Sequence, residues 1–394
     1  MFNRIAINRQ SLTGAPIDLG FLAECLLFYE EVRVVADQDL FRYLMRCCGP
    51  DELLELLSMG VLKLDFFENL TAVGTIQTNI GPVYELVVAD SPVLKFPQVS
   101  RKIVDEMAGS SGKGTSKMYN RLQRAVERSR YTPEMLKESH GDILDVRYLG
   151  PAIRSLLALV APEYQIPEPL DFQVEPVLKG GTYKVTTNID FNAANASYNQ
   201  HAPETHQSVL NVPYLLSLVA DARRDLVVGS RHQSEFAIAP ERAVAASCKF
   251  AEVLSAAGAG IKVADAFQET VIDGVPSIRD AVNSGNRNFR EVIQLLSKAQ
   301  KFKDRLKQQG NTEDLRKAYL QEVSHLDWAD NLPPKSLRWL LITAASIALG
   351  GTVIGTVAGT ALSAADAFLL DKLIKGWKPN QFVEGPLKQF LRLD

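Results

Sequence analysis

The chain has little cysteine, and its cysteines are poorly placed for a disulfide framework or a metal site. There are 4 cysteines in 394 residues, two of them adjacent, and no pair has the C-x-x-C spacing. Disulfide-stabilised secreted domains and zinc-binding modules are therefore not indicated. Cys25, Cys47, Cys48 and Cys248 all lie in apolar, helix-like surroundings, so we expect buried structural thiols.

The sequence also lacks an excess of basic charge and a secretory signal. Its 43 Lys and Arg residues are balanced by 46 Asp and Glu residues, which gives a formal net charge of −3. A domain that binds nucleic acid is normally basic, so we expect no nucleic-acid partner. The N-terminus has no apolar h-region, and we therefore expect the body of the protein to be cytoplasmic.

No catalytic motif is complete. The stretch Gly109–Thr115 resembles a phosphate-binding loop, but Met107 stands where that loop requires a glycine. His201 and His206 are too far apart for the H-E-x-x-H pattern that binds zinc on one helix. The cluster Ser230–Glu235 holds a serine, a histidine and a carboxylate, without a nucleophile elbow. We predict no catalytic residue, no metal and no cofactor, and leave open whether the protein is an enzyme.

The composition is that of a globular protein of two or three domains, with 46% hydrophobic residues. Periodicity predicts an α+β fold that is mainly helical. We expect five segments: a small mixed α/β module (1–92), a helical segment with a linker (93–165), a β-hairpin with a polar loop (166–206), a helical domain (207–335), and a Gly-rich apolar segment, helix or helical hairpin, with an amphipathic tail (336–394).

The N-terminal module alternates strand-like and helix-like runs and then continues as a meander. The strand-like runs are Arg4–Arg9, Val32–Ala36, Val61–Phe67, Thr71–Thr78 and Val83–Ala89. This order predicts a mixed sheet with helices packed on it. Asp37 and Asp39 follow a strand end, where α/β proteins often place functional residues. The simpler interpretation is that they are acidic caps at the start of a helix.

The central hairpin is the clearest strand signal. Alternating apolar residues lead from Phe172 into Gly180-Gly181 and continue out to Phe191. Pro176 cannot donate to a ladder of backbone hydrogen bonds, so the first arm should be an edge strand or contain a bulge.

Further along, Asn288 and Glu291 form a pattern that resembles a capping box at the start of an amphipathic helix. Five basic residues follow on the outer side of this helix: Lys298, Lys301, Lys303, Arg305 and Lys307. Such a run is usually a solvated face. The alternative is contact with an anionic lipid surface or an acidic partner.

The most distinctive stretch, Trp339–Ala365, has no charged residue. As a helix it would be roughly 40 Å long, enough to cross a hydrocarbon core of about 30 Å. Gly351, Gly355 and Gly359 recur every fourth residue, which gives a helix face that permits close packing against another helix. Trp339 and Trp377 bracket the stretch, as interfacial aromatic residues do.

The chain after this stretch predicts an amphipathic tail whose apolar side consists of Phe382, Leu387, Phe390 and Leu391. Two functions remain open. In the first, a non-enzymatic bacterial protein binds or senses a protein partner through its cytoplasmic body. Its glycine-repeat segment self-associates and binds or permeabilises a lipid membrane, the inner one, as a stress or antiviral effector. In the second, a soluble ligand-binding protein or enzyme, a hydrolase or a nucleotide-binding protein, buries the glycine-repeat helices in its core.

Overall fold

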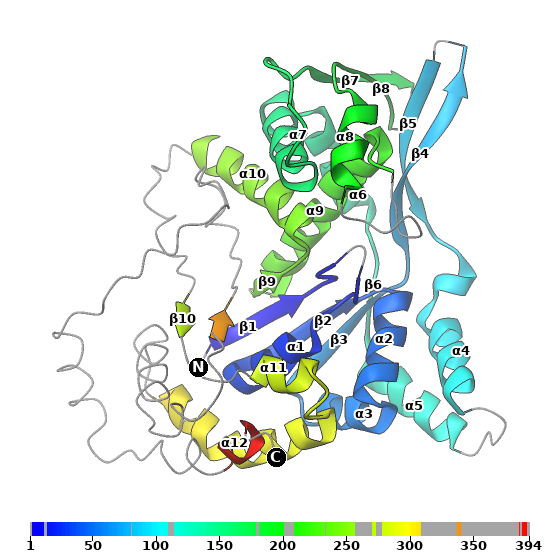
Figure 1. Cartoon of the computed structure of the whole chain (residues 1–394). Coiled ribbons are helices and arrows are strands. Elements are labelled where there is room, and N and C mark those ends of the chain that lie inside the picture. The colour runs from blue at the N-terminus through cyan, green and yellow to red at the C-terminus, as the bar shows by residue number, and fades with distance from the viewer. Residues whose placement is uncertain are drawn as a thin grey trace, which may run out of the picture.

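A computed structural model describes residues 2–11, 14–79, 81–108, 114–178, 181–200, 209–232, 234–256, 270–272, 278–308, 337–339, 386 and 388–391. These residues form a mixed α/β fold in which helices surround two main sheets (Figure 1). The uncharged stretch beyond Trp339 (340–365), with Gly351, Gly355 and Gly359, lies outside the described residues. Trp377 lies outside them as well.

The larger sheet is parallel and has the strand order β6-β3-β2-β1-β9. Its strands are β1 (Phe2–Ile7), β2 (Tyr29–Ala36), β3 (Leu62–Phe67), β6 (Glu127–Ser129) and β9 (Glu235–Ala237). From β1, the strands β2, β3 and β6 follow one another on one side of the sheet. β9 pairs with β1 on the other side. The order of the strands therefore reverses between β1 and β9, and we call this place the switch point.

Side chains of the parallel sheet alternate between two apolar cores. Ile5 and Ile7 of β1 face the first core, and Ala6 faces the second. Helices cover both faces, as a parallel sheet requires. The first core contains side chains of α1 (Leu19–Phe28), α2 (Gln38–Cys48), α3 (Pro50–Ser58), α4 (Phe96–Ala108), α5 (Thr115–Ala125), α11 (Ile278–Asn283) and α12 (Phe289–Gln308). The second contains side chains of α6 (Pro133–Leu144), α7 (Val146–Val160), α8 (Phe191–Tyr198), α9 (Val212–His232) and α10 (Pro240–Ala256).

The smaller sheet is antiparallel, with the strand order β4-β5-β8-β7. It consists of β4 (Leu70–Thr78), β5 (Gly81–Ala89), β7 (Phe172–Leu178) and β8 (Thr182–Thr187), and η1 (Pro92–Leu94) follows β5. We expected the meander to continue the N-terminal sheet. Instead β5 pairs with β8 of the central hairpin. β4 and β5 keep one face exposed, which suits an antiparallel sheet. β1, β2 and β3 are buried on both faces, as strands of a parallel sheet covered by helices are.

Several local predictions are confirmed, and others are corrected. Pro176 lies in an edge strand, with a register shift between Pro176 and Leu178. The strand expected to reach Phe191 ends earlier, because the side chain of Asp190 caps α8. Strand β6 lies in the segment 93–165 that we expected to be helical.

The cysteines are not all buried. Cys25 and Cys48 are buried and Cys248 is half-buried, whereas Cys47 is exposed. Adjacent residues on a helix point in different directions, so Cys47 and Cys48 cannot both face the core. Burial raises the pKa of the Cys48 thiol, with the neighbouring Cys47 as a further cause.

Candidate functional site

Helix α12 begins with the capping box that the sequence predicted. The backbone N–H of Glu291 donates to Oδ1 of Asn288 over 3.1 Å, and the N–H of Asn288 donates to Oε2 of Glu291 over 2.9 Å. Two backbone donors at the helix start are thereby satisfied. The capping box fixes where α12 starts, next to the site described below.

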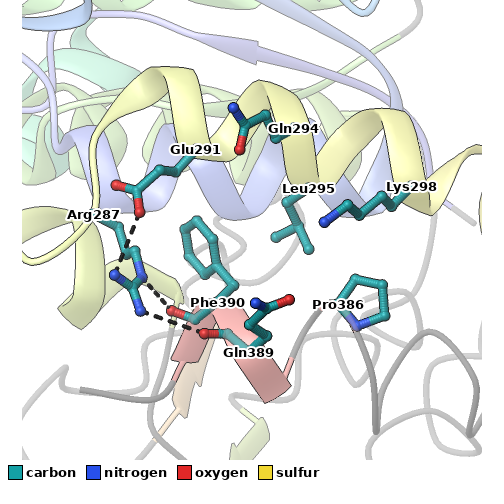
Figure 2. Close-up of a pocket in the computed structure, with 8 residues that line it drawn as sticks. All are labelled: Arg287, Glu291, Gln294, Leu295, Lys298, Pro386, Gln389 and Phe390. Carbon is teal, nitrogen blue, oxygen red and sulfur yellow. Dashed lines mark hydrogen bonds and ion pairs between the residues drawn. The ribbon is translucent and has the colours of Figure 1, made fainter. Parts of the chain in front are cut away.

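A C-terminal piece of the chain, α17 (Lys388–Leu391), packs against the first turns of α12. Figure 2 shows the ring of Phe390 beneath α12, between Arg287 and Leu295. Phe390 is only 7% exposed and belongs to the same apolar core as Phe289 and Leu295. The apolar side of the predicted amphipathic tail is therefore directed, at this residue, into the protein itself.

Arg287 holds the backbone of this tail. Its Nε donates to the carbonyl oxygen of Phe390 over 2.7 Å, and its Nη2 donates to that of Gln389 over 3.4 Å. Nη1 donates to Oε1 of Glu291 over 3.3 Å, which keeps the guanidinium oriented (Figure 2). The guanidinium carbon also lies 5.9 Å from the centre of the Phe390 ring. One arginine thus links the capping box of α12 to the tail.

A cavity of about 410 Å³ adjoins this contact. It is lined by Arg287, Glu291, Gln294, Leu295, Lys298, Pro386, Gln389 and Phe390 (Figure 2). Lys298 belongs to the predicted basic surface and is exposed. Helix α12 also includes Lys301, Lys303, Arg305 and Lys307, whose side chains lie outside the described residues.

The start of the uncharged stretch differs from the helix that we expected. Trp339 belongs to a strand, β11 (Leu337–Trp339), which pairs with β10 (Thr270–Ile272). Trp339 lies opposite Thr270 in this pair. A backbone paired with another strand is extended, so a helix here could begin only after Trp339. Of the helices that the structure describes, none is long and apolar enough to span a bilayer.

A second candidate site lies at the switch point. Asn8 follows β1, and its Nδ2 donates to Oδ1 of Asp225 on α9 over 2.5 Å. Nη1 of Arg242, near the start of α10, lies 3.3 Å from Oδ2 of Asp225. Arg242 also donates to the carbonyl oxygen of Arg9. Asp225 is 3% exposed and Arg242 is 2% exposed, so this ion pair is shielded from water.

Further charged groups surround this pair. Nε of Arg224 lies 3.7 Å from Oδ1 of Asp225, and Nη1 of Arg224 lies 3.5 Å from Oδ1 of Asp221. Asp221 in turn accepts from Oγ1 of Thr71 over 2.9 Å. Burial raises the pKa of Asp225, although Arg242 and Arg224 act in the opposite direction. A charged side chain buried this deeply destabilises the fold when it loses its partner of opposite charge.

The simpler interpretation of Asp37, as a cap at the start of a helix, is confirmed. Its Oδ1 accepts from the N–H of Leu40 over 2.8 Å and so caps α2. Its Oδ2 also lies 3.3 Å from Nη2 of Arg9. Ligands of open α/β sheets bind at the carboxyl ends of the strands, at the place where the strand order reverses. Asn8, Arg9, Asp37 and Arg242 lie there. Asn8 and Arg242 are buried against Asp225, whereas the side chains of Arg9 and Asp37 are 23% and 32% exposed and could hydrogen-bond a polar ligand.

The remaining candidates give no complete site. Nε2 of His232, at the end of α9, lies 3.8 Å from Oδ2 of buried Asp65 on β3. Burial lowers the pKa of His232, and Arg33 lowers it further. Sequence reasoning missed Asp65, although a single carboxylate in the apolar run LKLDFF was a signal.

The glycine-rich loop at 109–113 and both loop histidines, His201 and His206, lie outside the described residues. Among the residues that are described, no group of three or more His, Cys, Asp or Glu side chains could hold a metal ion. No protein-family model matches the chain, and no curated protein or solved structure is detectably similar to it.

Proposed function

We propose that this protein acts without catalysis. Its α/β body binds or senses a partner, and the C-terminal segment (336–394) self-associates and binds or permeabilises a membrane, as an effector in a bacterial stress or antiviral response. The observation that carries this proposal is the attachment of the tail to α12 through Arg287 and Phe390. That contact would let the body control the uncharged stretch that precedes the tail.

The structure describes residues on both flanks of the uncharged stretch, and the C-terminal flank supports this control. On its N-terminal side, β11 pairs with β10. On its C-terminal side, Phe390 packs into the core beneath α12. The contact of Phe390 therefore joins the chain beyond the stretch to the body, whereas β10 and β11 are described as paired with each other and not with the two main sheets.

A single crossing of a bilayer would break the contact between Phe390 and α12. As a helix, residues 340–365 suffice for one passage through about 30 Å of hydrocarbon, not for two. After one passage, Phe390 would be on the far side of the membrane from α12. The contact between Arg287 and the tail therefore belongs to the uninserted state, and insertion would require its release.

The experiment compares the full-length protein with two variants on dye-loaded vesicles that contain anionic lipid. Arg287→Ala should increase vesicle binding and dye release, because the tail is then held less firmly. Gly355→Leu should abolish dye release and leave the body folded, because it fills the face on which helices would associate.

The matched control is Arg290→Ala, three residues further along the same helix. Arg290 pairs with Glu52, not with the tail, and its side chain is 74% exposed. It should behave as the wild type. If none of these proteins binds vesicles, or if Arg287→Ala and Arg290→Ala have equal effects, the proposal is wrong.

The second candidate function is that of a ligand-binding protein whose glycine-repeat helices are buried in its core. The polar groups at the switch point favour it, because α/β proteins bind ligands there. In that case the full chain would remain in solution without detergent. Gly355→Leu would then destabilise the fold by about 1–3 kcal/mol through overpacking, which denaturant unfolding would detect.

A further inference from the structure

The two edges of the antiparallel sheet are built differently. The β7 edge contains Glu175, Pro176 and a register shift, and each of these features hinders pairing with another chain. The β4 edge reads LTAVGTIQT, with no charge and no proline, and it pairs with β5 over all nine residues without a shift. Natural proteins rarely leave such an edge unprotected.

The other edges are short. In the parallel sheet, the edge strands β6 and β9 have 3 residues each. β10 and β11 have 3 residues each as well. Among the strands that the structure describes, β4 is thus the one long, uncharged edge, and its hairpin projects from the body (Figure 1).

The pairing with β5 shows which backbone groups of β4 point outward. Thr78 and Gly81 flank the turn, and Gln77 lies opposite Pro82, which has no N–H. Hydrogen-bonded and non-hydrogen-bonded pairs alternate along an antiparallel ladder. The residues whose N–H and C=O groups point away from β5 are therefore Thr71, Val73, Thr75 and Gln77.

Among the strands that the structure describes, none pairs with the outer side of β4, whose side chains point to the two faces of the sheet. Thr71 donates to Asp221 on α9, and Val73 packs on the second core, so that face of β4 is turned to the body. Leu70 and Ile76 lie on the opposite face and are 37% and 42% exposed. Both are large apolar residues that a neighbouring strand would partly cover.

We propose that β4 pairs with β4 of a second copy of this chain, antiparallel and about a two-fold axis at Gly74. This register places Thr71 opposite Gln77 of the second copy and Val73 opposite Thr75, so every outward backbone group gains a partner. It overlaps all nine residues, and no charge faces its own copy. Two four-stranded sheets become one continuous sheet across a self-complementary interface.

Sedimentation velocity on the full-length protein, in mild detergent to disperse any lipid-like association, tests the interface. The wild type should be dimeric. Thr75→Pro removes one outward N–H in each copy and places a ring in the interface, so the dissociation constant should rise roughly 10- to 100-fold. Thr75→Val keeps the N–H and should dimerise as the wild type does. A monomeric wild type, or equal dimerisation of Thr75→Pro, overturns the proposal.

Cross-linking tests the register even where Thr75→Pro fails to fold. At a non-hydrogen-bonded pair the two Cα atoms lie about 4.5 Å apart, within the range of a disulfide. A Cβ at Gly74 would meet only the carbonyl oxygen of Glu85, at 3.9 Å, so Gly74→Cys fits. In a Cys47→Ser background, Gly74→Cys should form a covalent dimer on oxidation and Ala72→Cys should not. Failure of Gly74→Cys, or equal cross-linking of Ala72→Cys, overturns the two-fold at Gly74.

Discussion

Helix α9 and the tail on α12 are attached to the same body by different means. α9 is held on one side by the buried pair of Asp225 and Arg242. On the other side Arg223 binds both carboxylate oxygens of Asp142 on α6, over 2.5 Å each. The tail is held by one aromatic side chain and by hydrogen bonds from one arginine to backbone carbonyls.

This difference separates permanent structure from structure that can open. Removing one member of a buried ion pair leaves the other charge without a partner in a dry interior, so the whole fold loses stability. A short segment near the end of the described chain can instead detach while the body stays folded, because opening is local. We therefore expect substitutions at α9 to act globally and substitutions at the tail to act locally.

The largest effect is expected for Asp225→Ala. It leaves Arg242 and Arg224 buried without their common carboxylate, and the free energy of unfolding should fall by about 3–5 kcal/mol. Denaturant titration measures this loss. Asp221→Ala, on the same helix but at a partly exposed carboxylate, should cost far less. Equal losses in the two variants would contradict a special role for the buried pair.

Asn288→Ala should have an intermediate effect. The variant loses one half of the capping box, and the expected cost is about 1 kcal/mol. Hydrogen exchange should show faster opening of the first turn of α12, and the amides of α9 should be unchanged. A loss as large as that of Asp225→Ala would erase the contrast between the two attachments.

Phe390→Ala should change global stability by less than about 1 kcal/mol, although Phe390 is nearly buried. The reason is that the tail can leave its site without unfolding the body. Limited proteolysis should instead cut the chain near residue 386 much faster than in the wild type. Cooperative destabilisation of the body, with unchanged cleavage, would show that the tail is part of the permanent core.

The smallest effect is a pH dependence at the end of α9. Burial holds the pKa of His232 below its ordinary value, so the folded state favours the neutral ring. As the pH falls through the ordinary value near 6.5, the unfolded chain takes up the proton first, and stability is lost. Burial lowers the pKa of His140 in the same direction.

His232→Gln should therefore flatten the fall in unfolding free energy between about pH 8 and 5. Asn288→Ala, which touches no histidine, should keep the slope of the wild type. An unchanged slope in His232→Gln would assign the pH dependence to other groups.

Features that depend on near neighbours could be predicted from the sequence. The capping box of Asn288 and Glu291, the cap at Asp37 and the edge position of Pro176 all follow from residues within a few positions of one another. Short-range geometry determines these features, and the surrounding fold only has to permit them.

Features that depend on distant residues could not be predicted. Asn8 and Asp225 are 217 positions apart, and Arg287 and Phe390 are 103 positions apart. The tail was expected to be amphipathic, and Phe390 was placed on its apolar side, but no local pattern identifies α12 as the surface it meets. The strands β6 and β9 are also too short for periodicity to detect.

The position of β9 has a consequence for biosynthesis. β1 is translated long before one of its two neighbours, β9, which begins only at residue 235. Until then β1 presents an unpaired side, and α9, whose side chains form part of the second apolar core, has only just been made. Closing a contact over such a distance is slow, and an exposed strand attracts other chains. The nascent N-terminal half should therefore be a client of chaperones until the middle of the protein has been translated.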